Sequence, residues 1–309
     1  MQPSLFLSSG DLIADRRYQR AKDYEAHGDL GAAADLLEQT VELVPGFASA
    51  WFALGELREG LSDRDGAVAA FSQALSIDQQ DRQGSKLRLA LLGHGAPAEA
   101  MSSGYVRALF DQYAPEFDRA LTERLGYRAP QLLLNAVMAT GKASGRVPRF
   151  NRTLDLGCGT GLAGGVFAPT TDVLIGVDLS PAMIEIARRK GCYQRLVLAD
   201  MHAFIAEEAD ASAGVVIAAD AFVYLSDLAP ICREIARVLE WGGLFAFTVE
   251  THDGAGAVLG EKLRYAHCTE HVRTALAAAD LKLHVLTPAS TRREAGVPAP
   301  GLVVVADRQ

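Results

Sequence analysis

The second half of the chain takes its fold from the stretch Leu154-Asp155-Leu156-Gly157-Cys158-Gly159-Thr160-Gly161. Its apolar start is typical of a buried strand, and its glycines leave the backbone bare where a helix is expected to begin. A ligand can then lie directly against the loop and the start of that helix. In parallel α/β sheets, ligands bind at this position, the carboxyl end of a strand. The stretch therefore predicts a ligand-binding loop between a strand and a helix.

From Arg152 onward, short apolar segments alternate with helical ones, and this alternation predicts a doubly wound parallel sheet. The expected strands cover residues 153–156, 173–177, 195–199, 214–219, 244–249, 282–286 and 302–306. The expected helices between them cover residues 161–166, 181–189, 228–239 and 270–279. Ser180 can cap the second of these helices, and Pro181 suits its first turn.

Carboxylates accompany the first four expected strands. Asp155 lies inside the first strand, whereas Asp178, Asp200 and Asp220 close the next three. Asp178 is placed where a carboxylate can accept both hydroxyls of a ribose. A glycine loop surrounded by carboxylates predicts a site for a cationic nucleoside, because an ammonium or sulfonium group is attracted to them. For Asp200 the alternative is a cap on the helix that follows.

The glycines alone leave a second interpretation open. Gly159, Gly161 and Gly164 also spell G-x-G-x-x-G, the dinucleotide motif. Asp155 argues against a dinucleotide, since its charge would repel a pyrophosphate. A short-chain oxidoreductase also needs a Tyr-x-x-x-Lys pair after the loop, but Tyr18 and Lys22 precede it. An NAD-dependent oxidoreductase is therefore the weaker alternative.

These motifs resemble those of class I S-adenosylmethionine-dependent methyltransferases. The resemblance is carried by LDLGCGTG (154–161), Gly176-Val177-Asp178-Leu179-Ser180, Leu198-Ala199-Asp200-Met201, Ala219-Asp220-Ala221-Phe222 and RVLEWGG (237–243). It implies a Rossmann-like, seven-stranded α/β methyltransferase domain that binds S-adenosyl-L-methionine and releases S-adenosylhomocysteine. The segment 105–118 is expected to fold as helix, turn and helix, and its part 110–118 resembles the lead-in helix of methyltransferases for ubiquinone precursors and carrier proteins.

The resemblance also implies which residues bind the cofactor. They are Asp155, Gly157, Cys158, Gly159, Gly161, Asp178, Leu179, Asp200, Met201, Asp220 and Ala221, with Tyr105, Phe110 and Tyr113 as a lid. In this assignment Asp155 serves the methionyl part, Asp178 the ribose and Asp200 the adenine. Cys158 is expected to fill space rather than act as a nucleophile, because nothing basic adjoins it.

The expected catalytic residues are His267, Asp220 and Tyr224, near the carboxyl ends of the later strands. His267 is the preferred general base because histidine titrates near neutrality, and a capping or exposed histidine is the alternative. Other residues considered for acceptor contact are Glu250, His252, Arg264 and Tyr265. The segment 267–271 also matches the zinc motif H-x-x-E-H, but without a strong third ligand no metal is expected. The absence of an Asn-Pro-Pro-Tyr-like stretch at residues 219–222 disfavours amino-methylation of DNA bases or glutamine amides.

The first third of the chain repeats itself at a period of about 34 residues. Trp51, Leu54, Gly55, Ala67 and Phe71 spell W-x2-L-G and A-x3-F of the tetratricopeptide pattern, and Tyr24, Ala33, Leu37 and Pro45 form an earlier copy. This segment resembles two tetratricopeptide repeats followed by a capping helix, and a generic array of helical hairpins is the alternative. With the second half, nearly the whole chain resembles the bacterial tetratricopeptide-containing methyltransferases.

A cluster of helix breakers at residues 93–97 marks the expected domain boundary. The expected domains are the all-α repeat module at 1–95, a helical lid or lead-in at 96–150, and the methyltransferase domain at 151–309. The repeats are expected to dock a small-molecule, carrier-bound or protein acceptor, or to serve oligomerisation. A non-catalytic scaffold with a vestigial nucleoside-binding domain is the alternative function.

The composition limits the partners and the compartment. The 309 residues carry 30 basic and 38 acidic side chains, a net charge of −8, so nucleic acid and anionic membranes are not expected as partners. No apolar stretch approaches the roughly 20 residues that span a membrane. Four cysteines without a C-x-x-C pair suit a reducing compartment, so a cytoplasmic protein is expected.

Overall fold

The computed structural model describes residues 5–143, 145 and 149–309. The chain divides into two compact units, Met1–Leu109 and Phe110–Gln309. Each unit has its own buried hydrophobic clusters. The division falls inside helix α6 (Ser103–Arg119) and not at the breaker cluster, and the boundaries expected after residues 95 and 150 stay a prediction.

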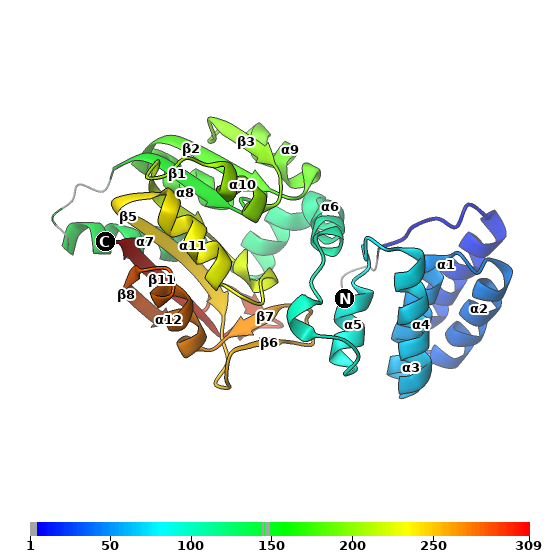
Figure 1. The fold of residues 1–309 in the computed structure, drawn as a ribbon. Helices are drawn as coiled ribbons and strands as arrows, with labels where there is room; N and C mark the ends of the chain where they lie inside the picture. Colours follow the sequence, from blue (N-terminus) through cyan, green and yellow to red (C-terminus); the bar gives the residue numbers. More distant parts are fainter. Residues whose placement is uncertain (1–4, 144, 146–148) are drawn as a thin grey trace. The chain divides into compact units, whose positions relative to one another are not determined.

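The first unit is helical (Figure 1). Its α-helices before α6 are α1 (Leu12–Ala26), α2 (Leu30–Leu43), α3 (Ala48–Gly60), α4 (Arg64–Ile77) and α5 (Ser85–Leu91), with a short 3-10 turn η1 (Pro97–Glu99). Asp29 and Asp63, which occupy equivalent positions in the two repeats, cap α2 and α4 by accepting from the amides of Ala32 and Gly66. The helices therefore begin at chemically equivalent points one repeat apart.

Small residues let these helices pack closely. Ala33 and Ala67 have no exposed surface, and neither have Leu37 and Phe71, one turn further on. A Cβ on Gly55 would lie 2.6 Å from the ring of Phe71, so only glycine fits between α3 and α4. The expected helical hairpins are present, and their assignment as tetratricopeptide repeats stays a prediction.

The second unit contains a mixed sheet with the order β3-β2-β1-β4-β5-β11-β8. Its strands are β1 (Phe150–Leu156), β2 (Thr171–Asp178), β3 (Arg195–Leu198), β4 (Ala213–Ala218), β5 (Leu239–Glu250), β8 (Leu281–Pro288) and β11 (Gly301–Arg308), with β6 (Ala257–Leu259) and β7 (Tyr265–His267) beside β5. A separate ribbon pairs β9 (Arg293–Glu294) with β10 (Val297–Pro298).

The expectation of a wholly parallel sheet is wrong at its last strand. β11 runs antiparallel to both β5 and β8. Only the short β9–β10 ribbon connects β8 to β11, and a parallel return would need a longer crossover, usually helical. The expected Rossmann-like α/β architecture is otherwise confirmed.

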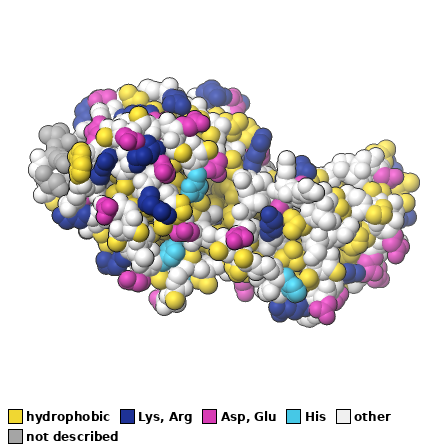
Figure 2. All heavy atoms as spheres, viewed as in Figure 1, with side chains coloured by type: hydrophobic (Ala, Val, Ile, Leu, Met, Phe, Trp, Pro, Cys, Tyr) yellow, Lys and Arg dark blue, Asp and Glu magenta, His cyan; other side chains and the backbone are white. Residues whose placement is uncertain are grey.

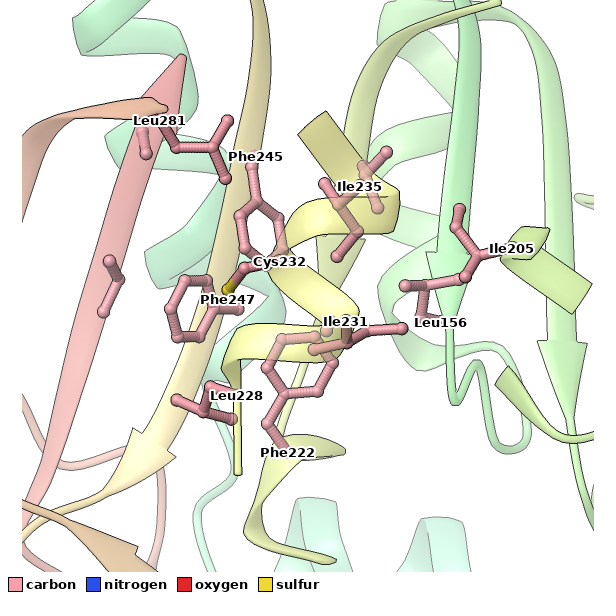
Figure 3. Packing of buried hydrophobic residues seen from close by; sticks show 14 of the residues in the cluster. Leu156, Ile205, Phe222, Leu228, Ile231, Cys232, Ile235, Phe245, Phe247 and Leu281 are labelled. Atoms are coloured by element: carbon pink, nitrogen blue, oxygen red, sulfur yellow. The ribbon is translucent and has the colours of Figure 1, made fainter. Parts of the chain in front are cut away.

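Helices cover both faces of the sheet (Figure 1). They are α7 (Ala129–Ala143), α8 (Leu162–Phe167), α9 (Pro181–Lys190), α10 (Met201–Glu207), α11 (Ala229–Val238) and α12 (Thr269–Ala277), with shorter turns at η2 (Ala120–Arg124), η3 (Ala168–Thr170) and η4 (Phe222–Tyr224). One buried cluster packs α10, α11 and α12 against the sheet, and Phe222 of η4 joins Phe245 and Phe247 within it (Figure 3). A second cluster packs α7 and α8 on the opposite face.

Charged side chains of both signs are mixed on the face that Figure 2 shows. This mixture agrees with the small excess of acidic over basic residues in the sequence, 38 against 30. In the described part of the chain, no helix is both long and apolar enough to cross a membrane.

Candidate functional site

The glycine loop joins β1 to α8 at the carboxyl edge of the sheet, as expected. Gly157, Gly159 and Gly161 have φ angles of 68°, 53° and 88°, a left-handed region that other residues rarely adopt. A Cβ on Gly157 would also lie 2.7 Å from the Cβ of Ala221, so the loop passes directly against the end of β4. Cys158 is buried, and burial raises the pKa of its thiol well above the ordinary value. It therefore lacks the thiolate character of a nucleophile.

Asp178 closes β2 and is fixed by the loop itself. Its two carboxylate oxygens accept hydrogen bonds from the amides of Gly159 at 2.8 Å and Ser180 at 2.9 Å. Burial raises the pKa of Asp178 to about 6, although both amide bonds favour the charged form. Because a carboxylate has about four acceptor positions, Asp178 can still accept hydroxyl groups from a ligand.

Asp155 lies almost wholly inside the protein, with 1% of its surface exposed. The Tyr193 hydroxyl donates to its Oδ2 at 2.6 Å, and its Oδ1 has no partner among the described residues. Burial, helped by the nearby Asp178 charge, raises the pKa of Asp155 to about 7, although the hydrogen bond from Tyr193 favours the charged form. The sequence analysis did not identify Tyr193.

Tyr193 reaches Asp155 through a socket formed by glycines. A Cβ would lie 3.0 Å from its ring at Gly161, 2.3 Å from it at Gly164 and 2.8 Å from it at Gly176. Gly164, which completes the dinucleotide-like spacing, is thus explained by the packing of a tyrosine. Gly161 and Gly164 at the start of α8 and Gly176 within β2 were the available sequence signal for a large side chain at this place.

The pair Asp155 and Asp178, called here the glycine-loop carboxylates, has no cationic partner in the described parts of the chain. The buried Asp155 and the partly buried Asp178, both with raised pKa values, then interact electrostatically at the edge where ligands bind. Such an arrangement is favourable only when the acids are protonated or when a cation approaches them. The donor set therefore fits a ligand that carries positive charge and hydroxyl groups.

Aromatic residues of α6 lie beside the loop. Phe117 is 3.8 Å from the position of a Cβ on Gly159, and the rings of Phe110 and Tyr113 pack edge-on against it at 6.0 and 5.4 Å. Phe110 also contacts Tyr224 of η4, with 5.4 Å between ring centroids. Phe110, Tyr113 and Tyr224 are thus brought together near the loop, and Phe117 is an addition that the sequence analysis missed.

Two aspartates fasten this part of α6 to the loop region. Asp111 accepts from the Ser180 hydroxyl at 2.6 Å, at the start of α9. Asp118 accepts from the Thr160 hydroxyl at 2.5 Å and pairs with Lys190 at 2.6 Å. The segment expected to fold as helix, turn and helix is instead one continuous helix that contains Pro115.

Asp200 caps α10, which is the alternative that the sequence analysis left open. Its Oδ1 accepts from the amides of His202 at 2.8 Å and Ala203 at 3.4 Å. Its other oxygen takes no part in the cap. Leu179 and Met201 are partly buried near the same edge, and their contacts with an adenine ring stay a prediction.

Asp220 lies at the other end of the site and is fully engaged. It adopts a φ of 55°, and its Oδ1 accepts from the Thr248 hydroxyl at 2.6 Å. Its Oδ2 accepts from Thr291 at 2.9 Å and from Arg292 at 2.7 Å. Three donors occupy both oxygens of this carboxylate, so the geometry favours Asp220 as a positioning residue, and its catalytic role stays a prediction.

Asp220 belongs to an ionic cluster that we call the arginine network, and its members are Asp220, Glu250, Glu294, Arg264, Arg292 and Lys262. Arg292 pairs with all three acids, and its side chain is only 7% exposed. Burial raises the pKa of Glu294, but the hydrogen bond from Lys262 and the charges of Arg264 and Arg292 outweigh it and lower this pKa to about 2. Positive and negative charges are thus balanced within the network.

His267 lies on β7 with no exposed surface. Both ring nitrogens lack a hydrogen-bond partner among the described residues, and the ring of His271 lies 5.2 Å away. Burial lowers the pKa of His267 to about 4, so the ring is neutral at physiological pH. Neither alternative from the sequence, a capping or an exposed histidine, describes it, and its role as general base stays a prediction.

Of the other predicted residues, Tyr105 does not belong to the second unit. Tyr105 belongs to the first unit, where its ring lies against Gly84, so its place in the lid stays a prediction. Tyr127, which the sequence analysis missed, is electrostatically coupled to Asp155, Asp220 and Arg292, and burial raises its pKa well above the ordinary value. The Tyr127 side chain is therefore near charged groups at both ends of the site. Among the described residues, no group of three or more His, Cys, Asp or Glu side chains is arranged to hold a metal ion.

Residues 154–247 match the protein family described as "Methyltransferase domain". The chain is 35% identical over 162 residues to Methyltransferase-like protein 27 of Homo sapiens, covering 52% of this chain and 62% of that protein. It is 34% identical over 130 residues to the malonyl-[acyl-carrier protein] O-methyltransferase of Legionella pneumophila, covering 39% of this chain and 45% of the relative. The chain thus spans less than two thirds of the length of these curated relatives.

Among solved structures, the fold is similar to the 1,6-didemethyltoxoflavin-N1-methyltransferase of Burkholderia thailandensis, which was determined with bound S-adenosylhomocysteine. The TM-score is 0.53 at 18% identity, over 70% of this chain and 91% of the other. This likeness concerns the fold, whereas the family match covers the glycine loop and the acids after it. Residues 154–247, within the second unit, therefore match a methyltransferase domain by sequence, and the fold around them is similar to that of a solved methyltransferase.

Proposed function

We propose that the protein is an active methyltransferase that moves a methyl group from S-adenosylmethionine to a small-molecule, carrier-bound or protein acceptor. The observation that carries the proposal is the pair of glycine-loop carboxylates, which lacks a protein cation within the described chain. S-adenosylmethionine offers an ammonium, a sulfonium and two ribose hydroxyls to such a pair. A dinucleotide would bring a pyrophosphate to the same carboxylates and be repelled.

In this proposal each residue has a defined task. Asp178 accepts the ribose hydroxyls while the Gly159 and Ser180 amides keep its carboxylate oriented. Asp155 faces the ammonium, with Tyr193 fixing one of its oxygens. The glycines allow the ligand to approach the backbone, and Phe110, Tyr113 and Phe117 exclude water.

The bound cofactor supplies an activated methyl group, which leaves a neutral thioether when it is displaced in line. The protein then needs mainly to hold the acceptor atom in line, at about 3–3.5 Å from the methyl carbon. Tyr224 and Tyr127 lie where they can position such an acceptor, and the arginine network holds the end of β4 in place. A carboxylate acceptor needs no base, which suits a site whose histidine is buried and neutral.

The acceptor class is part of the proposal. The relative from Legionella pneumophila is named for a carrier-bound malonyl group, and the α6 segment resembles the lead-in of carrier-protein methyltransferases. We therefore include an acyl chain on a carrier protein among the first acceptors to be screened. The helical hairpins of the first unit, in our interpretation two tetratricopeptide repeats, would dock the acceptor or its carrier.

Calorimetric titration with S-adenosylhomocysteine tests the nucleoside site. We expect micromolar binding that is lost in Asp178→Ala, and no binding of NADH. Asp172→Ala is the matched control, because Asp172 lies at the opposite end of the same strand and is exposed. A preference for NADH, or equal binding by Asp178→Ala, would overturn the proposal.

Docking by the first unit has a separate test. A variant without residues 1–95 should bind S-adenosylhomocysteine normally but lose kcat/KM on the true acceptor. Unchanged kinetics on that acceptor would refute docking while leaving the cofactor site intact. A non-catalytic scaffold is indicated if the nucleoside binds and no acceptor in the screen is methylated.

A further inference from the structure

Residues 5–9, which we call the strap, pass along the first unit before α1 begins and belong to no helix or strand. Two buried polar side chains hold the main chain of the strap. Ser49 Oγ accepts from the Leu7 amide at 2.8 Å, and the Gln83 side-chain amide donates to the Leu5 carbonyl at 3.0 Å. The bonds involve residues two apart in the strap, which is the repeat of an extended chain.

We call Ser49 and Gln83 together the clasp, and the two side chains are also bonded to each other. Gln83 Nε2 also donates to Ser49 Oγ at 3.1 Å, although they are far apart in the sequence. Ser49 has no exposed surface and Gln83 has 6%. Buried side chains that bond to main-chain atoms recognise the backbone of an extended segment rather than a particular sequence.

Aromatic side chains provide the specificity beside this clasp. The Phe6 ring lies 5.2 Å from that of Tyr18 and 6.1 Å from that of Phe47, and the last two are nearly fully buried. Phe6 itself remains 38% exposed. The surface therefore suits an uncharged segment that carries one aromatic residue between aliphatic neighbours.

The strap leaves the clasp incompletely satisfied. Gln83 Oε1 is buried and accepts no hydrogen bond from any described residue. An unpaired buried acceptor is unfavourable, so a segment that offers one more N–H donor would fit better than the strap does. The tether nevertheless favours the strap, because Ser8 and Ser9 bond to Asp15 and keep it close to the clasp.

We propose that the surface around Ser49 and Gln83 is a binding site for an extended, uncharged segment of a partner protein, and that the strap occupies it as a displaceable competitor. The partner segment presents its main chain to the clasp and an aromatic side chain to Tyr18 and Phe47. This inference goes beyond the proposed methyl transfer and does not depend on it, because no cofactor residue takes part.

The probe for this site is a fluorescent synthetic peptide with the sequence of residues 1–10. The strap is released in the full chain by the double substitution Leu5→Asp and Leu7→Asp, since charges disfavour its return to a partly buried position. We expect the released variant to bind the peptide at least about tenfold more tightly than the unaltered chain, because the tethered strap no longer competes. Adding Gln83→Ala should abolish this gain, whereas adding Gln79→Ala, an exposed glutamine nearby, should preserve it.

Equal binding by the unaltered and released proteins would overturn the proposal, and so would binding that persists in the Gln83→Ala variant. A second measurement covers a released variant that does not fold. In the unaltered chain, millimolar unlabelled peptide should accelerate hydrogen exchange at the Leu7 amide, which Ser49 protects. An unchanged exchange rate would contradict displacement.

Discussion

The two ends of the methyltransferase site hold their acids in opposite ways. The glycine-loop carboxylates are buried or partly buried without a protein cation, and their pKa values rise to about 7 for Asp155 and about 6 for Asp178. In the arginine network, each acid is paired with arginine, and the pKa of Glu294 falls to about 2. The glycine-loop carboxylates can be neutralised by a cation from outside the protein, whereas the charges of the arginine network balance one another within the protein. In the proposed function, this difference assigns the positively charged cofactor to the glycine-loop carboxylates and the acceptor to the other end.

The largest expected effect comes from removing the central cation of the arginine network. Arg292→Met leaves three partly buried carboxylates without their shared partner, so we expect the free energy of unfolding to fall by about 3–5 kcal/mol. Urea denaturation measures this loss. Arg293→Met is the control, because the exposed Arg293 bonds to the Gly296 carbonyl and should change stability little. Equal stability of the two variants would show that the network is not a structural support.

The pH dependence of the free energy of unfolding tests the glycine-loop carboxylates. Asp155 has a folded pKa of about 7 against an ordinary value of 3.8, so between these values the folded state binds more protons than the unfolded state. Stability must then fall as pH rises through this window and be lowest above the folded pKa. Asp155→Asn removes the contribution of this group, which changes the free energy of unfolding by up to about 1.4 kcal/mol per pH unit. Urea denaturation at pH 5 to 8 gives the slopes, and parallel slopes for the two proteins would contradict a buried, uncompensated Asp155.

A smaller effect tests how the socket holds Tyr193 against Asp155. In Gly164→Ala the new Cβ would lie 2.3 Å from the Tyr193 ring, and such overpacking costs about 1–3 kcal/mol. Gly165→Ala in the same helix meets nothing within 4 Å and should stabilise by up to about 1 kcal/mol. Thermal denaturation of the pair measures the difference. Two variants of equal stability would mean that the ring moves aside freely.

The sequence predicted the parts of this site that depend on local pattern. The strand-loop-helix unit at the glycine loop, the acids at the strand ends and the capping of α9 by Ser180 follow from short-range chemistry, and the structure places them as expected. Asp200 marks the limit of such prediction, because a helix-capping aspartate and a ligand-binding aspartate cannot be distinguished in the sequence.

What the sequence did not predict depends on long-range contacts. Arg292 reaches Asp220 from the far end of the chain, and Tyr193 reaches Asp155 across the sheet. The antiparallel direction of β11 likewise follows from how its connection packs, not from its apolar residues. His267 was chosen for its titration range, yet burial on β7 removes that property.

The most direct test of the charge comparison is proton release when S-adenosylhomocysteine binds. Calorimetry at pH 7 in two buffers of different ionisation enthalpy yields the number of protons exchanged. Because the ligand's ammonium favours the charged form of Asp155, we expect release of about half a proton near the folded pKa of the empty site. The release should vanish in Asp155→Asn. Binding without proton release, or equal release by the variant, would contradict the account that the glycine-loop carboxylates await a cation.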